Sequence, residues 1–452
     1  MTEEKAIFYE KISGLVVPIA IQNFMVAAVS ASDAIMLGVL NQDSLSAVSL
    51  AGQIQFVLNL FWYAITTGTT ILAAQYWGKG NREAISKILV IALKLSGAIS
   101  LTFCLAASFT PGLLMRIFTT DPVLIEMGSE YLKIVGISYL LAGLSQGYLC
   151  IMKNSGFTLK STMISSISMI LNIVLNAILI FGLLGVKPMG IAGAAIATVI
   201  SKLVEFVWVV ADSYRKNRIK LQGKYLMRTD PVLRKDFTHY MLPVLGNQLA
   251  WGCGFTMYTV IMGHLGSDAV AANSIANIVK NLISCFCLGI ASGASIMIGN
   301  ELGKDALKRA REYGDRIWKL AAVSGVVSGL ILLACSPVIL QHVNLSDTAR
   351  GYLKVMLMIC SYYLVGKSIN ATIISGIFSA GGDTRFGLIC DFVNMWCIVV
   401  PMGLLAAFYF KLPVLVVYFV LNLDEIIKIP VEFHHYWKYA WVKDLTRKQE
   451  VL

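Results

Sequence analysis

Charged residues are scarce in this sequence. Only 14% of its 452 residues are Asp, Glu, Lys or Arg, whereas soluble domains carry about a quarter. Apolar residues make up 57% of the chain, and stretches of the about 20 apolar residues that a membrane span needs recur from end to end. This composition excludes a soluble multidomain enzyme and predicts an all-α polytopic membrane protein.

Motifs for several other activities are missing as well. The nine cysteines form no CxxC pair and lie in apolar stretches, so we expect neither a disulfide framework nor a metal site. The five histidines do not cluster with Asp or Glu, which argues against an intramembrane enzyme. The segment Gly366-Lys367-Ser368 lacks the earlier glycine of a phosphate-binding loop, because that position is Ser361. We expect no cofactor, no enzymatic activity and no ATP hydrolysis by this chain.

The apolar runs number twelve. The first run is preceded by a mixed-charge start, 2–5 (TEEK), which is not the basic region that begins a signal peptide. A matching segment also recurs deep in the chain, so we expect a retained first span. The predicted spans lie near 14–40, 51–76, 88–114, 127–152, 160–184, 190–212, 237–264, 275–299, 315–341, 351–379, 386–410 and 412–432.

The net charge of +11 resides in the segments between these runs, which argues against nucleic-acid binding. Basic residues gather after even-numbered spans, eight of them between spans 6 and 7, where Arg228 lies, and four in the tail, which includes Arg447 and Lys448. Connections after odd-numbered spans are poor in Lys and Arg. By the positive-inside rule, we predict that both termini are cytoplasmic.

An internal repeat relates the two halves. At an offset of 225 residues, Pro18 matches Pro243, Gly38 matches Gly263, and the register continues for about 60 residues to Gly78 and Gly303. Six spans per repeat is an even number, so the halves point the same way across the membrane. We therefore predict two pseudo-symmetric six-helix lobes around a central cavity, residues 1–220 and residues 221–452, the second ending in a short basic cytoplasmic tail.

Four polar residues in the first half are candidates for an ion site. Asp33 lies well inside the first span, where a carboxyl group is costly unless it is protonated or bound to a cation. Asn172 and Asn176 share one face of span 5, and Thr198 lies on span 6. Two alternatives remain open from spacing alone: Asp33 lies at the outer membrane interface, and the amides and the hydroxyl only link helices together.

Other charges occur in or near spans. For each of them we expect pairing with an opposite charge or extension of the side chain toward the membrane surface. They are Lys94, Glu205, Lys367, Asp391, Asp424 and Glu425.

Several motifs in order resemble the multidrug and toxic compound extrusion (MATE) transporters, and the resemblance covers nearly the whole chain. They are Pro18 with 32–38 (SDAIMLG), 73–80 (AAQYWGKG), 171–176 (LNIVLN), 193–198 (GAAIAT), 298–303 (IGNELG) and 381–385 (GGDTR). The resemblance implies two six-helix lobes, a V-shaped central cavity and export of substrates against inward sodium or proton flow.

The family's cation site in the amino-terminal lobe would correspond to Asp33, Asn172, Asn176 and Thr198, and its bend in span 1 to Pro18. Some members carry aspartate where this chain has Asn176, so the site here has one carboxylate fewer.

One departure concerns a branch that resembles the NorM proteins. The glutamate that this branch places in span 7 aligns with Trp251 here, so coupling through it is not available. The second lobe offers three cation-site candidates of lower rank. They are Asp383, which aligns with an aspartate of that branch, Asp391 and Asp424.

We therefore predict a secondary active multidrug efflux antiporter of the plasma membrane that works by alternating access. We expect a small organic, cationic and amphipathic substrate, contact with membrane lipid and a monomeric state. The main alternative is a flippase of the same superfold that moves a lipid-linked or polyanionic precursor and needs a strongly cationic cavity. A channel is less favoured, because the two halves differ and carry a single acidic site.

Overall fold

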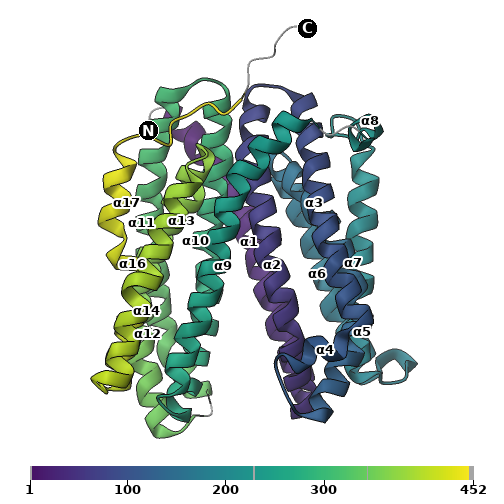
Figure 1. Ribbon diagram of the computed structural model, residues 1–452, viewed down its shortest axis with the longest axis vertical. Helices are drawn as coiled ribbons and strands as arrows, with labels where there is room; N and C mark the ends of the chain where they lie inside the picture. Colours follow the sequence, from purple (N-terminus) through teal and green to yellow (C-terminus); the bar gives the residue numbers. More distant parts are fainter. Residues whose placement is uncertain (1–2, 228–229, 344, 447–452) are drawn as a thin grey trace. The chain divides into compact units, whose positions relative to one another are not determined.

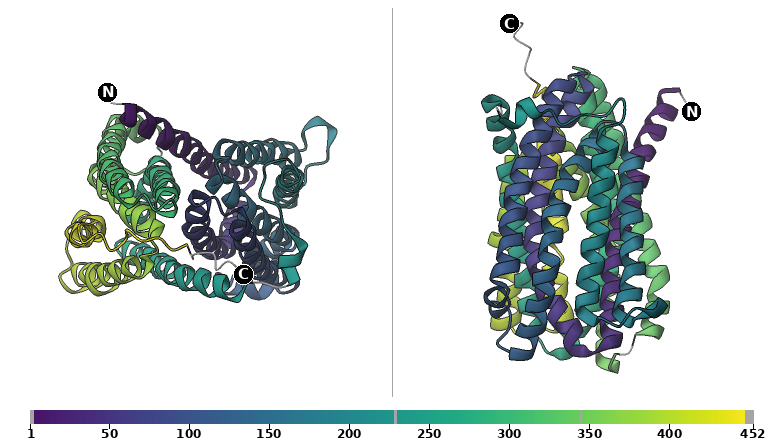
Figure 2. Two further views of the ribbon diagram at one scale, coloured as in Figure 1. Left: turned by 90° about the horizontal axis from the view of Figure 1, so that it is seen from above. Right: turned by 90° about the vertical axis from the view of Figure 1, so that its right-hand side faces the viewer.

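The computed structural model describes residues 3–227, 230–343 and 345–446, so Arg228, Arg447 and Lys448 lie outside the described residues. These ranges contain helices and no strand, and consecutive long helices run in opposite directions (Figures 1 and 2). The helices of the first half are α1 (Glu3–Leu40), α2 (Gln42–Gly78), α3 (Arg82–Phe109), α4 (Pro111–Arg116), α5 (Pro122–Asn154), α6 (Thr158–Phe181), the short 3₁₀ turn η1 (Leu183–Gly185) and α7 (Gly190–Ser213).

The second half is more often interrupted, because three π-helical stretches divide its later spans. Its elements are α8 (Gly223–Met227), α9 (Pro231–Gly263), α10 (Ser267–Gly303), α11 (Leu307–His342), α12 (Asp347–Asn370), η2 (Ala371–Phe378), α13 (Thr384–Phe392), η3 (Val393–Val399), α14 (Val400–Leu404), η4 (Leu405–Tyr409), α15 (Val414–Leu421), α16 (Asp424–Ile427) and α17 (Ile429–Tyr436).

All twelve predicted spans are present as helical segments. Within the described ranges, ten helices are long and apolar enough to cross a membrane. The seventh span, α9, is a 33-residue helix without a stretch as apolar as those of these ten. The twelfth is divided into α15, α16 and α17. Between α15 and α16 the Leu423 and Ile426 amides donate to carbonyls three residues earlier, those of Val420 and Leu423, at 3.2 and 2.9 Å.

Local sequence signals explain where several helices begin and end. The Asn81 side chain accepts a hydrogen bond from the Ala84 amide at 3.0 Å and begins α3. Asp121 does the same for Val123 at 2.9 Å, with Pro122 at the first helical position of α5. Gly182, which has a φ of +75°, ends α6 in a left-handed conformation that suits glycine.

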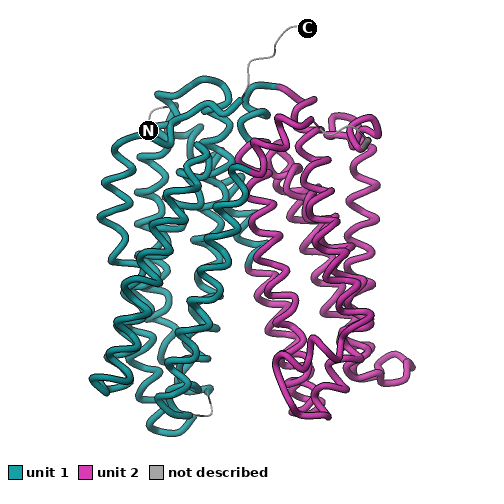
Figure 3. Tube along the Cα trace, viewed as in Figure 1, with its two compact units in different colours: residues 1–23, 74–80, 239–452 teal, residues 24–73, 81–238 magenta. Residues whose placement is uncertain are grey.

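The chain forms two compact units that exchange segments of α1 and α2 (Figure 3). Unit 1 contains residues 1–23, 74–80 and 239–452, and unit 2 contains residues 24–73 and 81–238. Helix α1 therefore begins in unit 1 and ends in unit 2, and it changes units five residues after Pro18. The predicted lobe boundary at 220/221 lies in the connection between α7 and α9, whereas the division by contacts falls at 238/239, inside α9.

Residues related by the internal repeat pack reciprocally where the end of α2 meets the end of α10, within unit 1. A Cβ on Gly78 would overlap the Asn300 carbonyl oxygen, and a Cβ on Gly303 would overlap the Gln75 carbonyl oxygen. Gln75 and Asn300 are themselves 225 residues apart, as are Gly78 and Gly303. Only glycine permits this close approach of two backbones, so the repeat is expressed as a local pseudo-twofold helix crossing.

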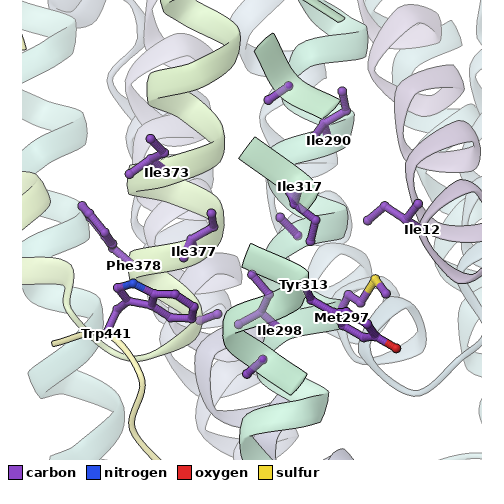
Figure 4. Close-up of a cluster of buried hydrophobic side chains, with 14 of the residues drawn as sticks. Ile12, Ile290, Met297, Ile298, Tyr313, Ile317, Ile373, Ile377, Phe378 and Trp441 are labelled. Atoms are coloured by element: carbon purple, nitrogen blue, oxygen red, sulfur yellow. The ribbon is translucent and has the colours of Figure 1, made fainter. Parts of the chain in front are cut away.

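A large apolar cluster fills the interior of unit 1 (Figure 4). Ile12 of α1, Ile290 of α10, Ile317 of α11 and Ile373 of η2 are each at most 2% exposed. Trp441, which follows α17, is fully buried in the same cluster and donates from its indole nitrogen to the Tyr436 carbonyl at 3.3 Å. Burial of these side chains explains why the first residues of the chain belong to unit 1.

Candidate functional site

Asp33 lies in the part of α1 that belongs to unit 2, and its closest polar partner comes from α6. The Asn176 side-chain nitrogen donates to Asp33 Oδ1 at 2.6 Å, a short bond of the kind that an ionised acceptor forms. Asn176 is fully buried, whereas Asp33 is half-buried and faces a cavity. No ion pair holds Asp33 among the described residues.

The other predicted residues continue this hydrogen-bonded chain. The same Asn176 nitrogen donates to Asn172 Oδ1 at 3.3 Å, and Asn172 in turn donates to Thr198 Oγ1 at 3.3 Å. Thr198 donates to the Ala194 carbonyl, one turn earlier on α7, at 3.0 Å. The structure thus brings all four predicted residues together from α1, α6 and α7, and the spacing of the two asparagines on α6 places them one above the other.

One buried acceptor in this group has no partner. Both hydrogens of the Asn176 amide are used by Asp33 and Asn172, and its Oδ1 finds no donor among the described residues. An unpartnered buried oxygen is unfavourable by about 1–3 kcal/mol. The Asn176 side chain belongs to the same hydrogen-bonded group as a carboxylate, a second amide and a hydroxyl, which supply the hard oxygen ligands that a small cation prefers. The group can therefore hold a monovalent cation, or a proton on Asp33.

The site opens into a cavity of about 430 Å³ within unit 2. Aromatic rings of Phe56, Trp62 and Tyr131 line it, together with the side-chain amides of Gln55, Asn59 and Gln146. Sequence reasoning missed these lining residues, since polar residues on α2 and α5 carry no periodic signal that marks a shared cavity. The one basic side chain among the described lining residues is Lys202, which pairs with Glu205 at 3.2 Å.

The lower-rank candidates of the second half lie in unit 1 and do not join the Asp33 group. Asp383, just before α13, accepts from the His435 side chain at 2.6 Å. Asp391 on α13 pairs with Lys428 at 2.9 Å and accepts from Asn247 at 2.8 Å. Asp424 on α16 is only 5% exposed.

Most charges expected to pair or to reach the membrane surface are paired. Lys367 contacts Glu425 at 3.2 Å, and Lys428 contacts Glu425 at 3.2 Å. Lys94 is exposed. Trp251, the position of the missing span 7 glutamate, instead receives the Lys367 ammonium over its ring at 5.6 Å.

Sequence reasoning did not single out Lys428, which is 11% exposed and forms two of these pairs, or Lys280 and Glu432, which are buried. A signal for two of them was present, because Asp424, Lys428 and Glu432 recur every four residues in an otherwise apolar run and so share one helix face.

Comparisons with known proteins agree with this architecture. The family model described as MatE matches residues 18–178 and 243–405, once in each half. The probable multidrug resistance protein NorM of Thermotoga maritima is 22% identical over 440 residues, 96% of this chain and 94% of the relative. The multidrug resistance protein MdtK of Photorhabdus laumondii is 24% identical over 411 residues, 86% of this chain and 85% of the relative.

Solved structures show the same fold. A MOP superfamily transporter from Pyrococcus furiosus superposes with a TM-score of 0.87 at 18% identity, covering 97% of this chain and 96% of that one. A variant of the Vibrio cholerae MATE transporter VcmN superposes with a TM-score of 0.86 at 17% identity, covering 96% of this chain and 97% of that one.

Proposed function

Since this chain belongs to the MatE family of multidrug efflux transporters, we propose that it exports small organic compounds by exchange for an inward sodium ion or proton at the Asp33 site. The observation that carries this proposal is the chain of hydrogen bonds from Asp33 through Asn176 and Asn172 to Thr198, with its one unpartnered buried oxygen. The site opens into the cavity of unit 2, so a bound ion and a bound substrate can compete for the same space.

The cavity supports a cationic, amphipathic substrate. A cation is attracted to the face of an aromatic ring, and Phe56, Trp62 and Tyr131 line the cavity together with the Asp33 carboxyl group. The chain works as a monomer surrounded by membrane lipid in this proposal, since each of the two features it needs, the ion site and the cavity, lies within one unit of one chain.

A flippase for a polyanionic lipid precursor is less well supported. Phosphate recognition favours unpaired arginine or lysine side chains. Lys202, the one basic side chain among the described residues that line the unit 2 cavity, already has Glu205 as its partner.

The decisive experiment imposes one ion gradient at a time across proteoliposomes that contain the purified protein. One charge that moves through about 100 mV supplies about 2.3 kcal/mol, which sustains a substrate gradient of roughly fiftyfold. Asp33→Asn keeps the size of the side chain and can still accept from Asn176, so the protein folds, but gradient-driven export should fall to background. The matched control is Asp43→Asn, which changes an exposed aspartate of the same unit and should export normally. Full export by Asp33→Asn would refute the proposal.

We also propose that the protein resides in the plasma membrane with both termini in the cytoplasm, which the distribution of Lys and Arg supports. Reporter fusions at position 225 and at the carboxyl terminus should report the cytoplasm, and fusions near 45 and 270 should report the outside. An external signal at position 225 would contradict the proposed orientation.

A further inference from the structure

A small polar cavity lies inside unit 1, whereas the cavity of the proposed transport site belongs to unit 2. Its volume of about 10 Å³ is close to the space that one water molecule occupies. Its polar lining consists of Asp391 on α13, Asn394 on η3, Asp424 on α16 and Lys428, which follows α16. Two of the four polar side chains, Asn394 and Asp424, are each only 5% exposed.

Two buried acceptors that line this cavity have no donor. Asp424 Oδ1 and Asn394 Oδ1 both lack a hydrogen-bond partner among the described residues. The orientation of the Asn394 amide is set by its nitrogen, which donates to the Asp424 backbone carbonyl at 2.7 Å. A flipped amide would place its oxygen against that carbonyl, so Asn394 Oδ1 remains an acceptor. Two buried acceptors of this cavity therefore lack a donor, although the Lys428 ammonium group and the Trp251 indole also line it.

The nearby lysine side chains contact groups other than the Asp424 carboxyl group. Lys428 contacts Asp391 Oδ1 at 2.9 Å and Glu425 Oε2 at 3.2 Å. Lys367 contacts Glu425 at 3.2 Å, and Lys280 lies over the Tyr363 ring at 4.3 Å, with Asn422 Oδ1 at 3.5 Å. None of the three ammonium groups forms an ion pair with Asp424 among the described residues.

The groups whose charges act on Asp424 come from several elements of unit 1. They are Lys280 on α10, Lys367 on α12, Glu425 on α16, and Lys428. Asp391 also lines the cavity, and Tyr258 on α9 with Tyr362 and Tyr363 on α12 lie near enough to interact electrostatically with Asp424.

With Glu432 included, three lysines and four carboxyl groups make up this cluster, in which Lys367 and Asp391 are 22% exposed, Lys428 is 11% exposed and the others are buried, so full ionisation leaves one unbalanced negative charge. Burial of an unbalanced charge costs several kcal/mol.

We propose that Asp424 binds one exchangeable proton. The proton removes the unbalanced charge and turns Asp424 into a hydrogen-bond donor inside the cavity. That donor satisfies Asn394 Oδ1, either directly or through the one water molecule that the cavity accommodates. The proton is taken from solvent and returned to it, so no other reactant is needed. The inference concerns unit 1 and holds whether or not Asp33 couples transport.

Two competing assignments are weaker. The nearby lysines oppose either positive charge at Asp424, but a sodium ion needs several oxygen ligands in a cavity of about 10 Å³, whereas a proton needs only the Asp424 carboxyl group. Glu432 is fully buried and both of its carboxyl oxygens are also unpartnered among the described residues. It does not line the cavity, however, and so has no comparable route for exchange with water.

The test is infrared difference spectroscopy of the purified full-length protein during a pH titration, which reports protonated carboxyl groups by their carbonyl band. We expect one band that shifts in deuterated water and titrates, that disappears in Asp424→Asn, and that persists in both Asp33→Asn and Glu432→Gln. Asn394→Leu keeps Asp424 but removes its acceptor, so the same band should remain and move to higher frequency. This second variant tests the proposal if Asp424→Asn fails to fold.

Three results would overturn the proposal. The band persists in Asp424→Asn, it is lost in Glu432→Gln, or it is abolished by adding sodium at constant pH, which would assign the cavity to a metal cation.

Discussion

The Asn176 side chain offers a test that separates the two possible coupling ions, because its removal acts on them in opposite directions. Asn176→Ala deletes the donor that contacts Asp33 Oδ1 at 2.6 Å. A hydrogen bond to a charged group contributes about 1.5–3 kcal/mol. Without it the ionised carboxylate loses that stabilisation and the protonated form does not. Half-maximal proton-driven transport should therefore move to higher pH by about one to two units.

The apparent affinity for sodium should change in the opposite direction and become weaker. The same substitution removes Asn176 Oδ1, the unpartnered oxygen that we propose as a ligand, and it strengthens competition by protons for Asp33. Loss of one ligand oxygen at about 1.4 kcal/mol corresponds to about a tenfold weaker apparent sodium affinity. A rise in proton affinity without sodium dependence would identify a proton-coupled exporter, and a fall in sodium affinity would identify a sodium-coupled one.

The assay is substrate transport in proteoliposomes, measured against pH and against sodium concentration. The matched control is Asn154→Ala in the same unit. Asn154 is 1% exposed, donates to Thr70 Oγ1 at 3.1 Å and also has an unpartnered Oδ1, but it does not contact Asp33. If Asn176→Ala leaves both dependences at their parental values, or if Asn154→Ala shifts them equally, the ion does not bind where we propose.

Two further predictions concern the scaffold. Gly303→Ala forces a Cβ into the Gln75 carbonyl oxygen and should lower the free energy of unfolding by about 1–3 kcal/mol, measured as a lower thermal unfolding midpoint. The control Gly351→Ala, in a helix with open space around the residue, should be neutral or stabilising by up to about 1 kcal/mol. Equal effects of the two substitutions would refute the packing argument. Pro18→Ala restores a backbone donor in α1 and should slow substrate turnover without changing ion affinity. The control Pro337→Ala alters a proline inside α11 and should leave turnover unchanged. Unchanged turnover in Pro18→Ala would show that Pro18 is not a hinge.

Much of the architecture could be predicted from hydropathy alone. A membrane span must be long, apolar and helical, because a backbone in lipid has to satisfy its own hydrogen bonds. The apolar runs therefore located all twelve segments, and the match between Pro18 and Pro243 showed that one six-span unit occurs twice. Helix ends are less predictable. For example, α1 begins at Glu3, well before its apolar run, because polar turns outside the lipid continue the same hydrogen-bond pattern.

The candidate ion site was predictable in part. The spacing of Asn172 and Asn176 places both side chains on one helix face, which follows from helix geometry. That Asp33 joins them from a helix far away in the chain was suggested by resemblance to a family, and only the packing of α1 against α6 produces the 2.6 Å contact.

The tertiary structure alone decided the remaining features. Hydropathy does not specify which neighbour an apolar helix face covers, so the sequence did not reveal that α1 begins in unit 1 and ends in unit 2. The sequence also did not reveal which partners Asp391, Asp424 and Lys428 have, because each appears there only as an isolated charged residue. A buried charge acquires its role from the partner that folding brings within a few ångströms, because a carboxylate paired with lysine and a carboxyl group beside an empty acceptor differ only in their surroundings. For Asp391 and Asp424 that difference arises from how α13, η3 and α16 meet.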